Sequence, residues 1–143
     1  MTQLAEVTPN TRRGARGFIL PPASLPGNPG ENRLLPQTVT ELERLGLSPR
    51  EVALDGGFLP GPTGETLDGR TLTRTFISGR AEPGSRRTRK RLQRYRTGIE
   101  GRISHLKRGY GLRRSRLKGY TGQRITTGWA ILAYNLDTYS HYT

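Results

Sequence analysis

The feature that most constrains this chain is the uneven placement of its charge. Residues 1–79 carry eight arginines and eight acidic side chains, whereas residues 80–143 carry sixteen basic and three acidic side chains. The window of residues 86–118 contains fourteen basic residues and one acid, Glu100. A block of like charge this dense repels itself unless an anionic partner neutralises it, and a nucleic-acid backbone is the usual partner.

Arginine outnumbers lysine in this basic window, which suits forked contacts to phosphate groups. We expect four side chains near its end to contact the nucleic-acid backbone, which predicts an affinity that falls steeply with salt. These side chains are Arg113, Arg114, Arg116 and Lys118. A solvated basic tail is the alternative interpretation of the same charge.

Length and composition exclude several classes of protein. A chain of 143 residues forms at most one domain, or a piece of a larger one. The absence of cysteine excludes disulfides, zinc ribbons and thiol catalysis. No apolar run approaches the roughly 18 residues that cross a bilayer, and no signal peptide is recognisable. We therefore expect a soluble cytoplasmic protein, associated with the nucleoid.

The first half of the chain shows alternating strand, helix and turn signals. We expect poor order over residues 1–17, which are polar and rich in arginine, and a domain over residues 18–143. Turn residues and apolar spacing predict a strand at residues 18–21 and a helix at residues 35–45. Two further strands are predicted at residues 51–54 and 71–78, separated by a glycine-rich loop at residues 56–69.

The second half is predicted to be mostly helical, which makes the whole an α/β fold with helices on a sheet. Residues 87–108 form a helix that is interrupted or bent near Gly98 and Gly101, and residues 109–122 form a basic loop. A last helix covers residues 125–139 and carries one apolar stripe, which its helical period predicts to be core. The stripe is Ile125, Trp129, Leu132 and Leu136.

One candidate for chemistry is Asp55, which follows the predicted strand at residues 51–54 and precedes Gly56 and Gly57. Ligand sites of α/β folds collect at the carboxyl ends of strands, and glycines let a phosphate approach the backbone closely. Asp-Gly is also a common turn pair, so a purely conformational role is equally consistent with this position.

Glu100 is the second candidate, because it is the only acid in the basic window. On a helix, Arg96, Glu100 and Lys107 fall within an arc of about 40°. One interpretation is an i, i+4 ion pair between Arg96 and Glu100, worth about 0.3–0.5 kcal/mol. The other is a carboxylate that binds a metal ion, flanked by cations that hold phosphates.

The spacing of these residues resembles a known family. Arg96, Glu100 and Lys107 match the R-x3-E-x6-K signature of bacterial insertion-sequence transposases that use an Asp-Asp-Glu triad. The segment VALDGGF at residues 52–58 resembles the region of the family's second aspartate, and residues 128–136 resemble its last core helix. The chain is thus similar to the C-terminal part of such a transposase.

The resemblance implies an RNase H-like catalytic core that cleaves and joins DNA strands at transposon ends. It implies that Asp55 and Glu100 are the catalytic residues and hold Mg²⁺ or Mn²⁺. It also implies that Arg96, Lys107 and the neighbouring Arg108 contact the DNA of the transposon ends.

The chain departs from this family in its number of candidate carboxylates. The triad needs an aspartate on an early strand, and Asp55 is the first aspartate in this sequence. We therefore expect a core that is incomplete at its N-terminal strands and inactive alone, with an upstream transposase chain as the source of the missing aspartate. The oligomeric state stays open.

Two other functions are compatible with the sequence. Residues 105–108 fit the H-x-x-R of tyrosine recombinases, in which Tyr134 or Tyr139 would attack DNA covalently without a metal. The second is a non-enzymatic basic nucleic-acid-binding protein. A metal-free covalent adduct with DNA would indicate the recombinase. Replacing Glu100 by glutamine separates the binder from a transposase, because only a metal site loses its dependence on Mg²⁺ or Mn²⁺.

Overall fold

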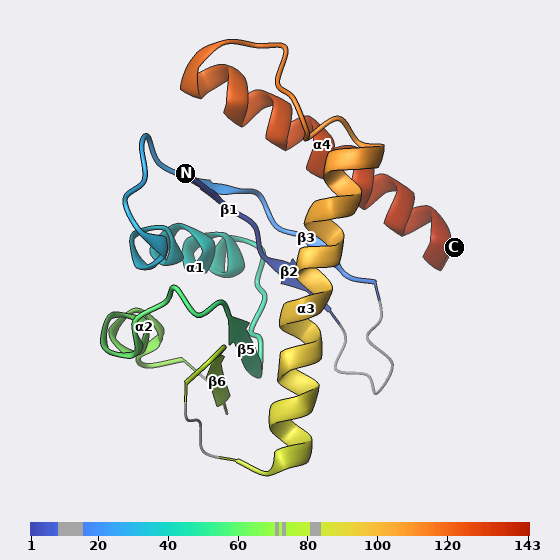
Figure 1. The fold of residues 1–143 in the computed structure, drawn as a ribbon. Helices are drawn as coiled ribbons and strands as arrows, with labels where there is room; N and C mark the ends of the chain where they lie inside the picture. The colour runs from blue at the N-terminus through green and yellow to red at the C-terminus, as the bar shows by residue number, and fades with distance from the viewer. Residues whose placement is uncertain (9–15, 71, 73, 81–83) are drawn as a thin grey trace.

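The chain folds into a mixed arrangement of helices and strands, in agreement with the predicted α/β class (Figure 1). Among the described residues the strands form three two-stranded sheets. Figure 1 shows α3 along one side of the molecule, α4 crossing near its end, and the smaller elements packed beside α3. The computed structural model describes residues 1–8, 16–70, 72, 74–80 and 84–143.

Two short antiparallel ladders lie at the start of the chain. β1 (Thr2–Gln3) pairs with β4 (Ala23–Ser24), and β2 (Glu6–Val7) pairs with β3 (Phe18–Ile19). We expected poor order over residues 1–17, but the structure places two strands there. Residues 9–15 lie outside the described part of the chain.

A buried carboxylate explains the order near β2. The Glu6 side chain is 6% exposed and accepts hydrogen bonds from the Gly17 backbone N–H at 2.7 Å and from Arg102 Nε at 3.2 Å. Arg102 lies far along the sequence, so a local pattern gives no sign of this contact. The ion pair fastens the N-terminal strands to α3.

The helix predicted over residues 35–45 is confirmed as α1 (Leu35–Arg44), which follows the 3₁₀ turn η1 (Glu31–Arg33). Gly46 follows α1 with a φ of 67°, a left-handed conformation that favours glycine and ends the helix. The apolar face of α1 packs into one of two core clusters. The buried members of this cluster are Leu35, Val39, Phe58, Leu67 and Ile77.

Two predicted strands are confirmed and lie side by side. β5 (Glu51–Leu54) and β6 (Arg74–Ile77) pair in parallel, with Leu54 opposite Ile77 at the end of the ladder. Parallel pairing brings the carboxyl ends of both strands to the same edge. The loop that follows β5 therefore lies beside the loop that follows β6.

Helix α2 (Pro60–Leu67) forms within residues 56–69, where we predicted a glycine-rich loop, so that prediction is wrong. The Asn32 side chain holds the start of this helix. Its Oδ1 accepts from the Leu59 backbone N–H at 2.7 Å, and its Nδ2 donates to Thr63 Oγ1 at 2.9 Å. Thr63 is 1% exposed, and this tertiary packing overrides the low helix propensity of glycine.

The long helix α3 (Arg86–Gly109) is uninterrupted, so the predicted break near Gly98 and Gly101 is wrong. Neither glycine has a heavy atom near the position of a Cβ, so both sit at open positions where glycine is tolerated. Ser85 Oγ caps the helix by accepting from the Thr88 backbone N–H at 3.2 Å. The unbroken helix keeps the angular spacing of its side chains.

The last helix, α4 (Gly119–Tyr142), extends beyond both ends of the predicted residues 125–139. Asn135 joins it to β3: its Oδ1 accepts from the Ile19 backbone N–H at 2.9 Å, and its Nδ2 donates to the Ile19 carbonyl at 2.8 Å. This contact anchors the second core cluster. The buried members of that cluster are Ile19, Leu106, Ala130, Ile131 and Tyr134.

The buried face of α4 is opposite to the one that we predicted. All four residues of the predicted stripe are exposed, and Trp129 is exposed by 67%. The buried face carries Thr127 and Thr138 instead, and Thr138 Oγ1 donates to the Tyr134 carbonyl at 2.8 Å. Because these hydroxyls bond within the helix, their burial costs little. The stripe is Ile125, Trp129, Leu132 and Leu136.

A charged network attaches the segment before β3 to α4. Asp137 Oδ2 accepts from Arg16 Nη2 at 2.8 Å and from the Tyr110 hydroxyl at 2.6 Å. These two hydrogen bonds hold the pKa of Asp137 below its ordinary value of 3.8, and the bond from Tyr110 has the larger effect. The bond to Asp137 also raises the pKa of the Tyr110 hydroxyl.

We expect Asp137→Asn to lower the thermal unfolding temperature near neutral pH but not in acid. A depressed folded-state pKa means that the carboxylate stabilises the fold above pH 3.8 and that this stabilisation is lost as the pH falls through the folded-state pKa. Unfolding temperatures measured from about pH 7 to about pH 2 should converge for the two proteins. Asp68→Asn is the matched control, and a gap that persists in acid would contradict the assignment.

Candidate active site

Asp55 stands at the edge where the parallel strands end. It directly follows β5, its side chain is 62% exposed, and its Oδ1 accepts from the Gly56 backbone N–H at 2.5 Å. A Cβ at Gly56 would lie 3.0 Å from the carbonyl oxygen of Ser78, which follows β6. The close approach of the two loops therefore favours glycine and fixes where the Asp55 carboxylate emerges.

Helix α3 packs along the β5–β6 pair, from the start of the strands to their carboxyl ends. Arg91 Nη2 forms an ion pair with Glu51 Oε1 at 2.6 Å, and this hydrogen bond raises the pKa of Arg91. Gln93 Oε1 accepts from Ser78 Oγ at 3.4 Å. These contacts fix the position of the next turns of α3, which carry Arg96 and Glu100.

Arg96 joins the two candidate carboxylates. Its Nη2 lies 2.7 Å from Glu100 Oε1 and 3.8 Å from Asp55 Oδ1. The Arg96 side chain is 18% exposed and its Nε is buried without a partner among the described residues, whereas the Glu100 side chain is 55% exposed. The i, i+4 ion pair considered from the sequence thus forms, and the same guanidinium also reaches Asp55. The structure brings Asp55 and Glu100 to one positive group.

The pair suits a hard divalent cation by its donor chemistry. Carboxylate oxygens are the ligands that Mg²⁺ and Mn²⁺ prefer, and both carboxylates face a shared cation. Among the residues that the structure describes, no group of three His, Cys, Asp or Glu side chains is placed to hold a metal ion. Further ligands would therefore come from substrate phosphates, water or another segment.

Two residues that lie beside Asp55 were given no role at the site from the sequence. The Glu31 carboxylate packs against Gly57 so closely that a Cβ there would overlap it. Asn32 binds the end of the same loop through Leu59, as described above. The only local sign of this role is the Asn-Pro-Gly turn before them, which marks a turn but not what the turn touches.

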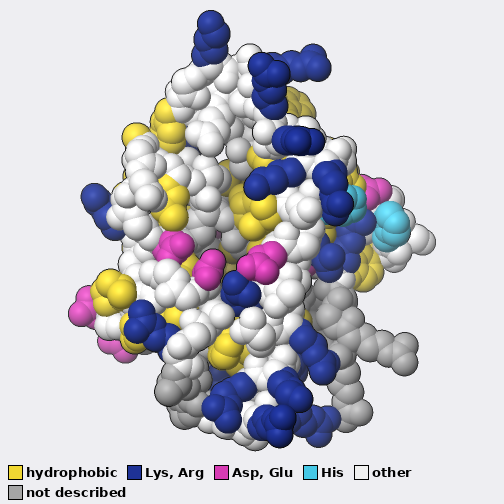
Figure 2. Space-filling view, viewed as in Figure 1, with side chains coloured by type: hydrophobic (Ala, Val, Ile, Leu, Met, Phe, Trp, Pro, Cys, Tyr) yellow, Lys and Arg dark blue, Asp and Glu magenta, His cyan; other side chains and the backbone are white. Residues whose placement is uncertain are grey.

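The predicted DNA-binding residues lie along α3 and beyond its end. Lys107 and Arg108 are exposed, and neither forms an ion pair with an acid in the described part of the chain. Because α3 is unbroken, Lys107 keeps the stripe of Arg96 and Glu100, about 10 Å from Glu100 along the axis. Figure 2 shows acidic side chains near the middle of this face with basic side chains above and below them.

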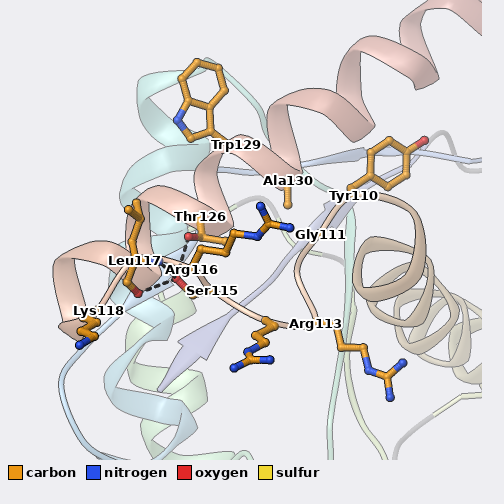
Figure 3. Close-up of a pocket in the computed structure, with 11 residues that line it drawn as sticks. Tyr110, Gly111, Arg113, Ser115, Arg116, Leu117, Lys118, Thr126, Trp129 and Ala130 are labelled. Atoms are coloured by element: carbon orange, nitrogen blue, oxygen red, sulfur yellow. Dashed lines mark hydrogen bonds between the residues drawn. The ribbon is translucent and has the colours of Figure 1, made fainter.

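The basic loop (residues 110–118) follows α3 and faces α4. Gly111 has a φ of 75°, and the Leu112 backbone N–H donates to the Leu106 carbonyl at 3.2 Å, so the loop turns sharply away from the helix. The loop and α4 line an open pocket of about 980 Å³ (Figure 3). Its basic lining residues are the four predicted phosphate contacts, Arg113, Arg114, Arg116 and Lys118, all exposed.

The covalent alternative has no support from the placement of Tyr134. This side chain is fully buried, and the His105 ring packs against the rings of Tyr110 and Tyr134. A buried phenol cannot reach a DNA phosphate, so Tyr134 is not a nucleophile of the recombinase type. Tyr139 is 61% exposed and lies on the outward face of α4.

Comparison with known proteins identifies the family. The family model described as transposase DDE domain matches residues 22–136, which confirms the resemblance found in the sequence. No curated protein and no solved structure matches the chain. No helix in the described residues is long and apolar enough to cross a membrane. Because the match spans most of the sequence, the chain belongs to the transposase DDE domain family.

Proposed function

We propose that this chain contributes Asp55 and Glu100 to metal-dependent cleavage and strand transfer of DNA at transposon ends. The observation that carries this proposal is the convergence of both carboxylates on Arg96 at the end of a parallel strand pair. Membership of a transposase family supports it independently. An RNase H-like core is the fold that this family implies.

In this proposal the two carboxylates hold Mg²⁺ or Mn²⁺, which when bound stabilises the leaving oxygen and activates a water or a 3′-hydroxyl. Asp55 is oriented by the Gly56 N–H, and Glu100 by the helix that packs on β5. Arg96 balances the negative charge of the pair and is positioned to contact a DNA phosphate. Lys107 and Arg108 extend the cationic surface along the same helix.

We further propose that the third carboxylate of the site comes from outside the described residues. No aspartate precedes Asp55 in the sequence, and the structure brings two carboxylates to Arg96. An upstream transposase chain is the proposed source, and this chain alone would bind DNA without transferring strands.

Glu100→Gln tests this function. We expect the wild-type protein to bind Mn²⁺ and the variant to bind it at least about tenfold more weakly. Loss of a residue that hydrogen-bonds to a metal ligand already weakens metal binding about 10- to 100-fold, and loss of the ligand itself should weaken it at least as much. Mn²⁺ titration followed by electron paramagnetic resonance measures this affinity. Asp55→Asn should behave alike, whereas Glu65→Gln, which removes an exposed acid on α2, is the matched control.

The duplex DNA affinity of the same variants, measured with and without Mn²⁺, distinguishes a metal-dependent enzyme from a non-enzymatic binding protein. Without metal, Glu100→Gln should bind duplex DNA as tightly as wild type or slightly more tightly, because a negative charge is removed from a basic surface. With Mn²⁺, only the wild type should gain affinity. If metal changes nothing in either protein, the non-enzymatic nucleic-acid-binding protein becomes the better account.

A further inference from the structure

Trp129 is the only tryptophan of the chain, and it is exposed. Trp129 is among the residues that line the pocket, and Figure 3 shows its side chain projecting from α4 away from the labelled residues of the basic loop. An indole that is 67% exposed is unusual, because large aromatic side chains are normally mostly buried. Such an exposed aromatic ring can stack on a ligand that has a flat, polarisable face.

The pocket combines two different kinds of surface. Leu117 and Ala130 give it an apolar part, and Figure 3 shows Arg113 on the side away from Trp129. The lining includes four cations and no acidic residue, and none of the four forms an ion pair with a described acid. Its volume of about 980 Å³ lies at the upper end of the roughly 300–1,000 Å³ that small-ligand sites occupy.

Hydrogen bonds hold this pocket in shape without a ligand. Ser115 Oγ lies 2.8 Å from Thr126 Oγ1, which joins the basic loop to α4, and the Leu117 backbone N–H donates to Ser115 Oγ at 3.2 Å. A Cβ at Gly122 would lie 2.7 Å from Leu117 Cβ, so glycine is required for α4 to approach the loop. A preformed pocket binds its ligand with a smaller entropic cost.

We infer that this pocket binds an unpaired nucleotide of a DNA strand, with the base stacked on Trp129 and the phosphates on the basic loop. Bases in a duplex present only their edges, whereas an unpaired base exposes a face that an aromatic ring can cover. A neutral apolar partner would leave the four cations unmatched, while a polyanion with aromatic bases matches both surfaces. The inference rests on the proposed DNA-binding function and names the form of DNA recognised.

The emission of Trp129 reports this contact directly, because no other tryptophan contributes. Titration with single-stranded oligothymidylate should quench the emission as the base stacks on the indole. A blunt duplex of the same length should bind through its phosphates and leave the emission nearly unchanged. Fluorescence anisotropy of end-labelled DNA, measured in parallel, gives both affinities independently of tryptophan.

Variants separate stacking from general apolar contact. Trp129→Leu should weaken binding of oligothymidylate at least about fivefold and change duplex binding less than about twofold, since one stacked base contributes on this scale. Trp129→Phe should keep most of the affinity. Leu136→Ala is the matched control, because Leu136 lies on the same face of α4 but does not line the pocket.

Three results would overturn the inference, and they differ in whether the proposed DNA-binding function survives. Single-stranded DNA that binds without quenching, or equally well to Trp129→Leu, removes the stacking site but keeps the proposed function. A dimer that Trp129→Leu dissociates shows that a second copy covers the indole. If neither form of DNA binds at low salt, the proposed function fails together with the inference.

Discussion

Replacing all four basic residues of the basic loop by alanine should lower the affinity for duplex DNA by on the order of a thousandfold near 0.1 M salt. Each phosphate contact adds about 0.9 to the slope of log K against log salt concentration, so the slope should decrease by about 3.6. The four side chains are exposed and free of ion pairs with described acids, so no compensating partner reduces the effect. They are Arg113, Arg114, Arg116 and Lys118.

A matched variant separates the effect of the basic loop on DNA affinity from the effect of the net charge of the protein. Four exposed arginines from the first 80 residues give the same change in charge when replaced by alanine, and two of them already pair with acids on α1. They are Arg33, Arg44, Arg70 and Arg80. Anisotropy titrations from about 50 to about 200 mM salt should show a much smaller change in slope for this control. Equal slopes for the two variants would mean that total charge, not the loop, determines binding.

Elements with strong local signals were predicted well from the sequence. Helix α1 has an apolar face, a proline in its first turn and Gly46 after its end, and each of these acts within one or two turns. The strand β5 was predicted from a short apolar run, and β6 from its β-branched and aromatic residues. In these cases the local preference and the tertiary structure agree.

Predictions failed where distant residues decide the local structure. Helix α2 forms in a glycine-rich stretch because Asn32 bonds to Leu59 and Thr63. The strand β2 is held in part by the ion pair between Glu6 and Arg102. Neither contact is visible in a sequence window, because the partners lie far apart along the chain.

The candidate site was only partly predictable for the same reason. The spacing of Arg96 and Glu100 gives an i, i+4 ion pair on any helix, and the structure has it at 2.7 Å. The approach of Arg96 to Asp55 depends on how α3 packs against β5, which the pair of Arg91 and Glu51 fixes. No local pattern encodes that packing.

The face of α4 that packs is the most instructive failure, and Tyr134→Ala tests it. Tyr134 is fully buried beneath the Arg16 guanidinium, which lies 4.4 Å from the centre of its ring. Truncation to alanine should lower the free energy of unfolding by about 3–5 kcal/mol in urea denaturation, as for other buried aromatic residues. Trp129→Ala, on the face that periodicity favoured, should change it by less than about 0.5 kcal/mol.

Tyr134→Phe sharpens the test, because the buried Tyr134 hydroxyl has no hydrogen-bond partner among the described residues. Removing an unpartnered polar atom from the core should leave stability unchanged or raise it slightly, since no bond is lost. A loss of more than about 1 kcal/mol in this variant would reveal a partner for the hydroxyl. If Trp129→Ala proved the more damaging variant, the buried and exposed faces of α4 would have to be exchanged. The pocket proposed for an unpaired base would then have no exposed indole.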